Sequence, residues 1–145
     1  MSRLVVDASM ALSWLLPDEQ SALSLAVRDE LLAAENVWAP AHWRLEVCNA
    51  LWMAERRKRL DATGVAQAVA LFTQLPVLVD PDTSDRAGSE TLALARQHTL
   101  SVYDAAYLEL ALRRGASLAS LDAALRAVAK GLGVPILPKK LPDES

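Results

Sequence analysis

Short apolar runs alternate along this chain with longer segments whose apolar residues recur at helical spacing. The runs predict strands at residues 4–6, 37–39, 76–79, 117–120 and 134–137. The intervening segments predict helices at residues 9–16, 18–34, 40–59, 61–72, 86–98, 104–114 and 122–132. Strands that alternate with helices pair side by side in a sheet with helices on both faces. The expected fold is therefore an α/β protein, a three-layer α/β/α sandwich with a short, mostly parallel sheet.

The length and composition indicate one domain. With 145 residues, 52% of them hydrophobic, the chain is large enough to bury a proper core. We expect one domain over residues 1–137 and a frayed, proline- and charge-rich tail over residues 138–145. No uncharged run is long enough to cross a bilayer and the first residues lack the pattern of a signal peptide, so the expected compartment is the cytoplasm. Cys48 is the only cysteine, which excludes an internal disulfide and predicts a small buried side chain.

The net charge limits how the chain can contact nucleic acid. A formal charge of −3 argues against a protein that coats nucleic acid through general positive charge. A local basic patch is still allowed, and the run from Arg56 to Arg59 is the best candidate. Such a run also suits a solvated helix end, where it complements the helix dipole. The sharper hypothesis is that Arg56, Arg57 and Lys58 contact the phosphates of a substrate.

Four carboxylates occupy positions that a parallel sheet can bring together: Asp7, Glu46, Asp104 and Asp122. Asp7 and Asp122 follow predicted strands, whose carboxyl ends meet at the edge where such sheets bind ligands. If the acids converge, each pair about 4 Å apart costs roughly 4 kcal/mol at an effective dielectric of about 20. A divalent cation or protons must relieve that repulsion. Carboxylates are hard oxygen ligands, which indicates Mg²⁺ or Mn²⁺.

Simple capping is the main alternative for three of these acids. Asp7 and Asp122 each precede a predicted helix and can accept hydrogen bonds from its unpaired amides, with Ser120 competing for the second site. Asp104 can form a capping box with Ser101. Capping accounts for each acid separately, but it does not explain why several acids fall at one edge of the sheet.

Glu46 lies inside a helix and needs a different explanation. Its apolar neighbours predict substantial burial, where an unpaired carboxylate is costly. Asn49 shares its helical face and is expected either to hold it or to extend the site, while a salt bridge with an arginine of another helix is the alternative. His42, four residues earlier, has a spacing that suits zinc, but no third soft ligand accompanies the pair.

Four blocks carry a family resemblance: Leu4–Ser9, Glu46–Leu51, Tyr103–Ala111 and Leu118–Asp122. In this order, over nearly the whole chain, they resemble the PIN-domain family and, more narrowly, the VapC toxins of bacterial toxin–antitoxin pairs. The resemblance implies an endoribonuclease that hydrolyses RNA phosphodiester bonds with Mg²⁺ or Mn²⁺. By this match the catalytic and metal-binding residues are Asp7, Glu46, Asp104 and Asp122. The supporting polar residues are Ser9, Asn49 and Ser120, the last of which is commonly threonine in the family.

The resemblance also implies partners, which are RNA, a cognate VapB-type antitoxin and a second copy of the chain in a homodimer. The four tryptophans either build the core or line a groove for the antitoxin: Trp14, Trp38, Trp43 and Trp52. Two other functions remain as alternatives. One is a catalytically silent PIN-like interaction module. The other is a phospho-accepting signalling domain, which the sequence matches poorly because paired acids do not follow the first strand.

Overall fold

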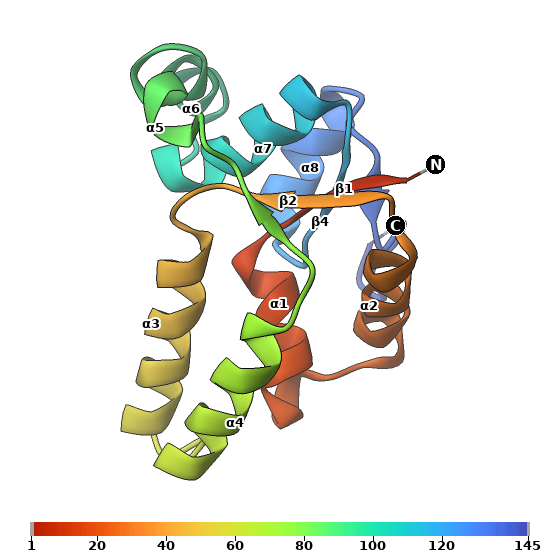
Figure 1. The fold of residues 1–145 in the computed structure, drawn as a ribbon. Helices are drawn as coiled ribbons and strands as arrows, with labels where there is room; N and C mark the ends of the chain where they lie inside the picture. The colour runs from red at the N-terminus through yellow and green to blue at the C-terminus, as the bar shows by residue number, and fades with distance from the viewer. Residues whose placement is uncertain (1, 145) are drawn as a thin grey trace.

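Five parallel strands form one sheet in the computed structural model, which describes residues 2–144 (Figure 1). The strands are β1 (Arg3–Val6), β2 (Asn36–Ala39), β3 (Leu78–Val79), β4 (Ser117–Ala119) and β5 (Ile136–Leu137). Their order across the sheet is β3-β2-β1-β4-β5, so β1 is central. Val5 pairs with Trp38 on one side and with Leu118 on the other. The predicted fold class is confirmed, and every pairing in the described sheet is parallel.

Helices cover both faces of the sheet (Figure 1). The lower layer in that view contains α1 (Ala8–Leu15), a 3₁₀ turn (Pro17–Glu19), α2 (Ala22–Ala33), α3 (Trp43–Arg56) and α4 (Ala62–Thr73). The upper layer contains α5 (Thr83–Arg86), a π-helical turn (Ala87–Thr91), α6 (Leu92–His98), α7 (Val102–Arg114) and α8 (Ala123–Gly131). None of these helices is long and apolar enough to span a membrane.

Capping residues set several helix boundaries. The helix expected from residue 18 begins instead at Ala22, because Pro17–Glu19 form a separate turn and Ser21 caps α2 through the Ser24 amide. The helix expected from residue 40 begins only at Trp43. Both differences shorten a predicted helix without changing the order of the elements.

The core lies on both faces of β1. Val5, Val6 and Leu118 are fully buried, as expected for strands covered by helices on two sides. Trp14 and Trp43 belong to this core and Trp38 packs against it, whereas Trp52 is 51% exposed.

Helix α3 shows why one prediction is wrong. It buries Trp43, Val47 and Leu51 at helical spacing, and this turns Cys48 outward. The expectation of a small buried cysteine is therefore wrong, and Cys48 is exposed.

A buried ion pair joins β3 to α7. Asp80, which the sequence places in an ordinary loop, is 1% exposed and accepts hydrogen bonds from Arg113 at 2.7 and 3.1 Å. Arg113 also binds Glu109 at 2.8 Å. Burial favours the neutral acid, but the hydrogen bonds from Arg113 and Thr83 hold the pKa of Asp80 below its ordinary value. The ion pair therefore joins the end of β3, at the edge of the sheet, to α7 in the upper layer.

Candidate active site

Asp7 lies at the carboxyl end of the central strand. It follows β1 with extended backbone angles and is the N-cap of α1, accepting a hydrogen bond from the Met10 amide at 2.9 Å. Its side chain also accepts bonds from the Ser9 hydroxyl at 2.7 Å and from the Ser120 hydroxyl at 2.5 Å. Asp7 therefore both caps α1 and lies at the carboxyl edge of the sheet.

The environment of Asp7 opposes its ionisation. Asp7 is 4% exposed, and among residues 2–144 no Lys, Arg or His forms an ion pair with it. Burial raises the pKa of Asp7 to about 6, and the charge of Asp122 adds to the rise. The hydrogen bonds from Ser120, Met10 and Ser9 act in the opposite direction. A buried carboxylate with no cationic partner is one that a bound cation would stabilise.

Two serine hydroxyls connect the β1–α1 junction to the β4–α8 junction. Ser120 donates to Asp7 and accepts from the Asp122 amide at 3.0 Å. Ser9 donates to the other oxygen of Asp7 and accepts from the Leu121 amide at 3.0 Å. Both serines, predicted as supporting residues, therefore lie in contact with Asp7.

Asp104 and Asp122 stand nearer the surface. Asp122 is exposed and caps α8 through the Leu125 amide at 2.9 Å. Asp104 is partly buried in the first turn of α7, and its amide donates to Ser101 at 3.0 Å. Burial raises the pKa of Asp104, and the charges of Asp122 and Glu46 raise it further. The four carboxylates are thus close enough to act on one another's charge.

Two side chains, His42 and Tyr107, contact the carboxylate of Glu46. Its Oε1 accepts a hydrogen bond from the Tyr107 hydroxyl at 2.8 Å and lies 3.0 Å from Nε2 of His42. Burial favours the neutral acid, yet the hydrogen bonds from His42 and Tyr107 lower the pKa of Glu46 below its ordinary value. The predicted partner, Asn49, is exposed and shares no hydrogen bond with Glu46 in the described part of the chain. Asn49 therefore does not hold Glu46, and its other expected role, extending the site, stays a prediction.

Sequence reasoning did not assign a role to Tyr107. Its spacing of three residues from Asp104 on α7 was the available signal, since such residues share a helical face. Burial and the nearby Glu46 strongly raise the pKa of Tyr107, so its hydroxyl stays protonated and donates. His42 was weighed only as a zinc ligand, and the structure shows it paired with Glu46 and 3.0 Å from the Tyr103 carbonyl oxygen.

The carboxylate oxygens are the ligand type that suits a hard cation, but the distances between the side chains do not yet form a metal site. Across residues 2–144, no three His, Cys, Asp or Glu side chains lie in an arrangement that would hold a metal ion. Both oxygens of Asp7 are engaged by hydroxyl and amide groups. Asp104 and Asp122 lie closer to solvent than Asp7, and one oxygen of Asp122 caps α8. Binding of an ion by the three carboxylates would therefore require these side chains to move.

The predicted substrate contacts lie apart from the carboxylates. Arg56, Arg57 and Lys58 are exposed at the far end of α3, which runs away from the sheet (Figure 1). At 1.5 Å per residue, Arg57 lies about 16 Å along the helix from Glu46. Arg59 is paired with Asp18 and Glu19 at 2.9 and 2.7 Å.

Comparison with known proteins identifies the family. The family model of the PIN domain matches residues 4–131. The chain belongs to the PIN-domain family. This PIN domain is 33% identical over 120 residues to "Ribonuclease VapC3" of Mycobacterium tuberculosis, covering 83% of this chain and 82% of that protein. The predicted membership is confirmed.

Two matches from Pyrobaculum aerophilum give similar results. "Ribonuclease VapC3" of Pyrobaculum aerophilum is 28% identical over 120 residues, which cover 83% of this PIN domain and 89% of that protein. The crystal structure of PAE2754 from Pyrobaculum aerophilum matches with a TM-score of 0.67 and 26% identity, covering 93% of this chain and 83% of that chain.

Proposed function

We propose that this chain is a Mg²⁺- or Mn²⁺-dependent endoribonuclease, the toxin of a VapBC-type pair. One observation carries the proposal: Asp7 is buried without a cationic partner at the carboxyl end of the central strand, with the Asp122 carboxylate acting on its charge. The relatives named ribonucleases support the reaction class. The four acids are the proposed catalytic and metal-binding residues.

The ligands of the ion would be Asp7, Asp104 and Asp122. When bound, it would neutralise charge on the scissile phosphate and make a water molecule more acidic. Ser9 and Ser120 hold the Asp7 carboxylate in a fixed orientation through its two oxygens. Tyr107 binds Oε1 of Glu46, which leaves the ionised carboxylate able to orient a water through its other oxygen.

The proposal is tested by cleavage of RNA in the presence and absence of Mg²⁺. Asp7→Asn should abolish Mg²⁺-dependent cleavage while the protein remains folded. Asp61→Asn is a matched control, because Asp61 caps α4 through the Gly64 amide at 2.7 Å but lies on an exposed surface. Retained cleavage by Asp7→Asn in a nuclease-free preparation would reject the assignment.

Two measurements separate the alternative functions. Calorimetry with Mn²⁺ should show binding that Asp7→Asn weakens, whereas no binding would favour a silent interaction module. Incubation with a small phosphodonor should leave the chain unlabelled, and incorporation of phosphate would favour a signalling domain. Both use the purified chain.

The RNA contacts of Arg56, Arg57 and Lys58 are tested by salt dependence. If all three bind phosphates, replacing them by alanine should reduce the slope of log affinity against log salt by about 2, at roughly 0.7 per contact. Such contacts would lie about 16 Å along α3 from Glu46. An unchanged slope would remove them from the substrate-binding surface.

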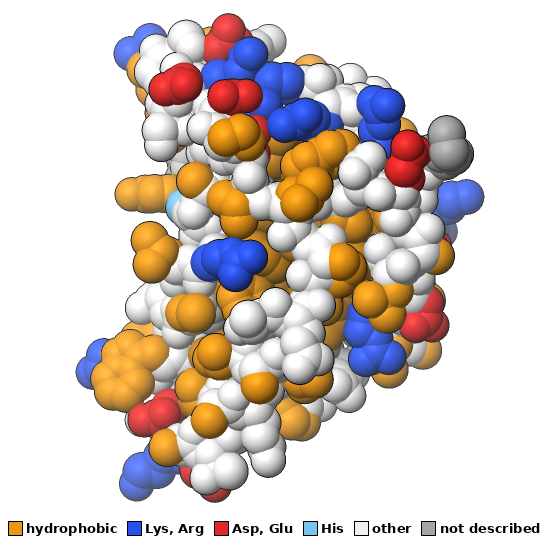
Figure 2. All heavy atoms as spheres, in the orientation of Figure 1, with side chains coloured by type: hydrophobic (Ala, Val, Ile, Leu, Met, Phe, Trp, Pro, Cys, Tyr) orange, Lys and Arg blue, Asp and Glu red, His pale blue; other side chains and the backbone are white. Residues whose placement is uncertain are grey.

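Exposed apolar side chains support a protein partner next to the site. Figure 2 shows apolar side chains along the edge of the molecule formed by α3. Leu45 is 76% exposed beside Glu46, Tyr103 is 65% exposed beside Asp104, and Trp52 lies about two turns beyond Leu45 along α3. We assign the antitoxin to this surface and expect the chain to form a homodimer.

The partners are tested by co-purification and light scattering. The chain should co-purify with the product of an adjacent reading frame, and Trp52→Ala should weaken that association. Light scattering of the isolated chain should give the mass of a dimer. Co-purification unaffected by the substitution would place the antitoxin elsewhere, and a monomer mass would remove the dimer.

A further inference from the structure

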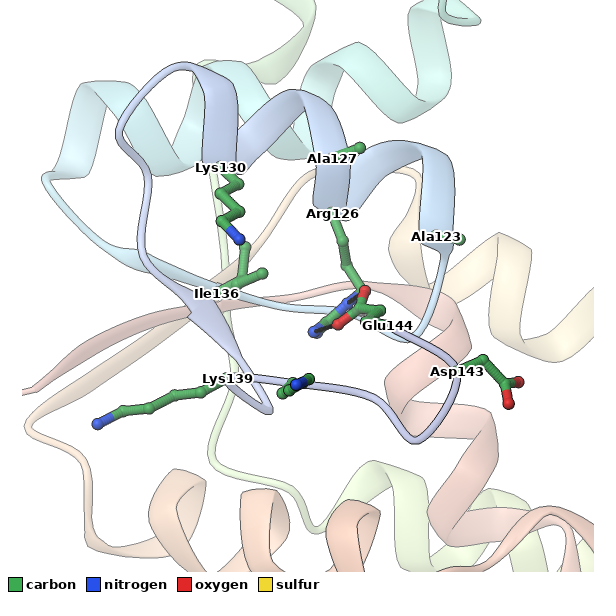
Figure 3. Close-up of a pocket in the computed structure, with 9 residues that line it drawn as sticks. Ala123, Arg126, Ala127, Lys130, Ile136, Lys139, Asp143 and Glu144 are labelled. Atoms are coloured by element: carbon green, nitrogen blue, oxygen red, sulfur yellow. Dashed lines mark hydrogen bonds and ion pairs between the residues drawn. The ribbon is translucent and has the colours of Figure 1, made fainter.

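A basic cavity lies between α8, β5 and the C-terminal segment (Figure 3). Its volume is about 620 Å³. The charged side chains that line it are Arg126, Lys130, Lys139, Lys140, Asp143 and Glu144. In the close-up, Lys130 reaches from α8 toward the C-terminal segment, while Lys139 and Asp143 point away from Arg126. Cationic groups outnumber carboxylates around this cavity, in a chain that is acidic overall.

Arg126 is the buried centre of the cavity wall. Its side chain is 1% exposed, and Nε and Nη2 donate to the two oxygens of Glu144 at 2.9 and 2.7 Å. Nη1 donates to the Ser120 carbonyl oxygen at 3.0 Å, which fixes the guanidinium against the end of β4. The segment expected to be frayed is thus bound to α8 through Glu144 in this structure. Two parallel donors on a fixed guanidinium match a phosphate as well as a carboxylate.

Ser120 connects this guanidinium to the proposed active site. Its carbonyl oxygen binds Arg126, and its hydroxyl binds Asp7 and the Asp122 amide. The Arg126 guanidinium that now binds Glu144 is therefore linked through one residue, Ser120, to the proposed metal ligands Asp7 and Asp122. A phosphate in place of the Glu144 carboxylate would therefore bind a guanidinium that shares Ser120 with Asp7 and Asp122.

Release of Glu144 from Arg126 would require another anion that competes for the guanidinium, because a change of pH near neutrality would not neutralise the carboxylate. The hydrogen bonds from Arg126 lower the pKa of Glu144 to about 2, so the carboxylate stays ionised at neutral pH. Without Glu144, a buried guanidinium would be left with two unpaired donors, which is costly. Only another anion can take over both bonds at little cost. Glu144 also accepts a bond from the Leu141 amide at 2.8 Å, so its release would free this part of the tail.

We propose that this cavity is a phosphate-binding subsite for the RNA strand, in which Arg126 is the specific contact and Glu144 occupies that contact until an RNA phosphate displaces it. Lys130 adds a second cation on the same wall, and Lys139 and Lys140 attract the strand at longer range. This assignment rests on RNA being the substrate, as proposed above.

The test is RNA binding by the full chain in EDTA, where no metal-dependent cleavage occurs. The probe is a fluorescein-labelled single-stranded RNA of about a dozen nucleotides, long enough to contact several cations, with anisotropy as the readout. Glu144→Gln keeps the shape of the side chain and removes its charge, so RNA should bind roughly fivefold more tightly. Inorganic phosphate should compete with the RNA more strongly in this variant than in the parent.

Asp143→Asn is the matched control. It makes the same charge change in the same segment, but the Asp143 side chain points away from Arg126. It should change the affinity by less than about twofold, as expected for an exposed charge. Equal tightening by the two variants would show a general charge effect and would overturn the subsite.

A second variant keeps the test decisive if Glu144→Gln is unstable. Lys130→Gln should weaken RNA binding at least about threefold in the otherwise unchanged chain. Unchanged affinity would overturn the subsite. Cleavage distinguishes this result from the proposed function: the subsite fails alone if the chain cleaves RNA with Mg²⁺ but neither variant alters binding. The nuclease proposal fails alone if both variants behave as expected and no cleavage occurs.

Discussion

Replacing Asp7 by asparagine should stabilise the metal-free protein at pH 8 by about 2 kcal/mol. The reason is that the carboxylate is buried at 4% exposure without a cation, and its pKa rises from 3.8 to about 6 on folding. Each pKa unit corresponds to about 1.4 kcal/mol, so keeping Asp7 ionised in the folded state costs about 3 kcal/mol. Asparagine removes this cost but loses the charge-assisted bond from Ser120, which offsets about 1 kcal/mol.

The effect must depend on pH in one direction. Because the folded-state pKa is raised, the cost of ionisation is fully present above about pH 6 and absent below about pH 3.8. The advantage of Asp7→Asn should therefore shrink as the pH falls from 7 to 4. Mg²⁺ or Mn²⁺ should reverse the comparison at pH 8, because an ion that binds only the folded wild-type chain stabilises it.

The assays are urea unfolding and thermal unfolding in EDTA at several pH values between 4 and 8, with Asp61→Asn as the control for loss of a capping carboxylate. At pH 8, the melting temperature of Asp7→Asn should rise by roughly 6 °C, at about 3 °C per kcal/mol for a chain of this size. A variant that is less stable than wild type at pH 8, or a difference that does not change with pH, would refute the electrostatic argument.

Two further substitutions test contacts that the fold creates. Tyr107→Phe removes the 2.8 Å hydrogen bond to Glu46. The Mg²⁺-dependent kcat should therefore fall about tenfold, and the free energy of unfolding should fall by about 1 kcal/mol. An unchanged rate of cleavage in a single-turnover assay would contradict the role of Tyr107 in positioning Glu46. Asp80→Asn should lower the free energy of unfolding by about 2 kcal/mol, because it leaves the largely buried Arg113 with fewer partners. Asp82→Asn, which is 52% exposed and 3.8 Å from Arg113, should change stability by less than about 0.5 kcal/mol. Equal effects of the two aspartate substitutions in urea unfolding would rule out the buried pair as the cause.

The order of elements and the positions of the acids follow from the sequence. Local rules were enough here, because strand and helix periods differ, because Asp7 directly follows an apolar strand, and because Asp122 lies three residues after the end of another. In an all-parallel sheet both residues must then fall at the same edge. The serines beside them were found for the same reason, since Ser9 and Ser120 belong to the two strand–helix junctions.

The contacts that hold those side chains were decided only by tertiary packing. The bond between Tyr107 and Glu46 joins residues 61 positions apart, and no local pattern states which helix covers which. Asn49 is exposed, and Glu46 is bound by Tyr107 and His42 instead, although the spacing from Glu46 made Asn49 a candidate partner.

Burial of charge was decided in the same way. Asp80 has the sequence context of a surface loop, but it is buried because Arg113 of α7 reaches it across the sheet edge. Glu144 has the context of a loose tail, but Arg126 binds it. A sequence shows which residues are charged and which segments are apolar. Whether a charge finds a distant partner depends on how helices pack on the sheet, and that packing is set by the whole chain at once.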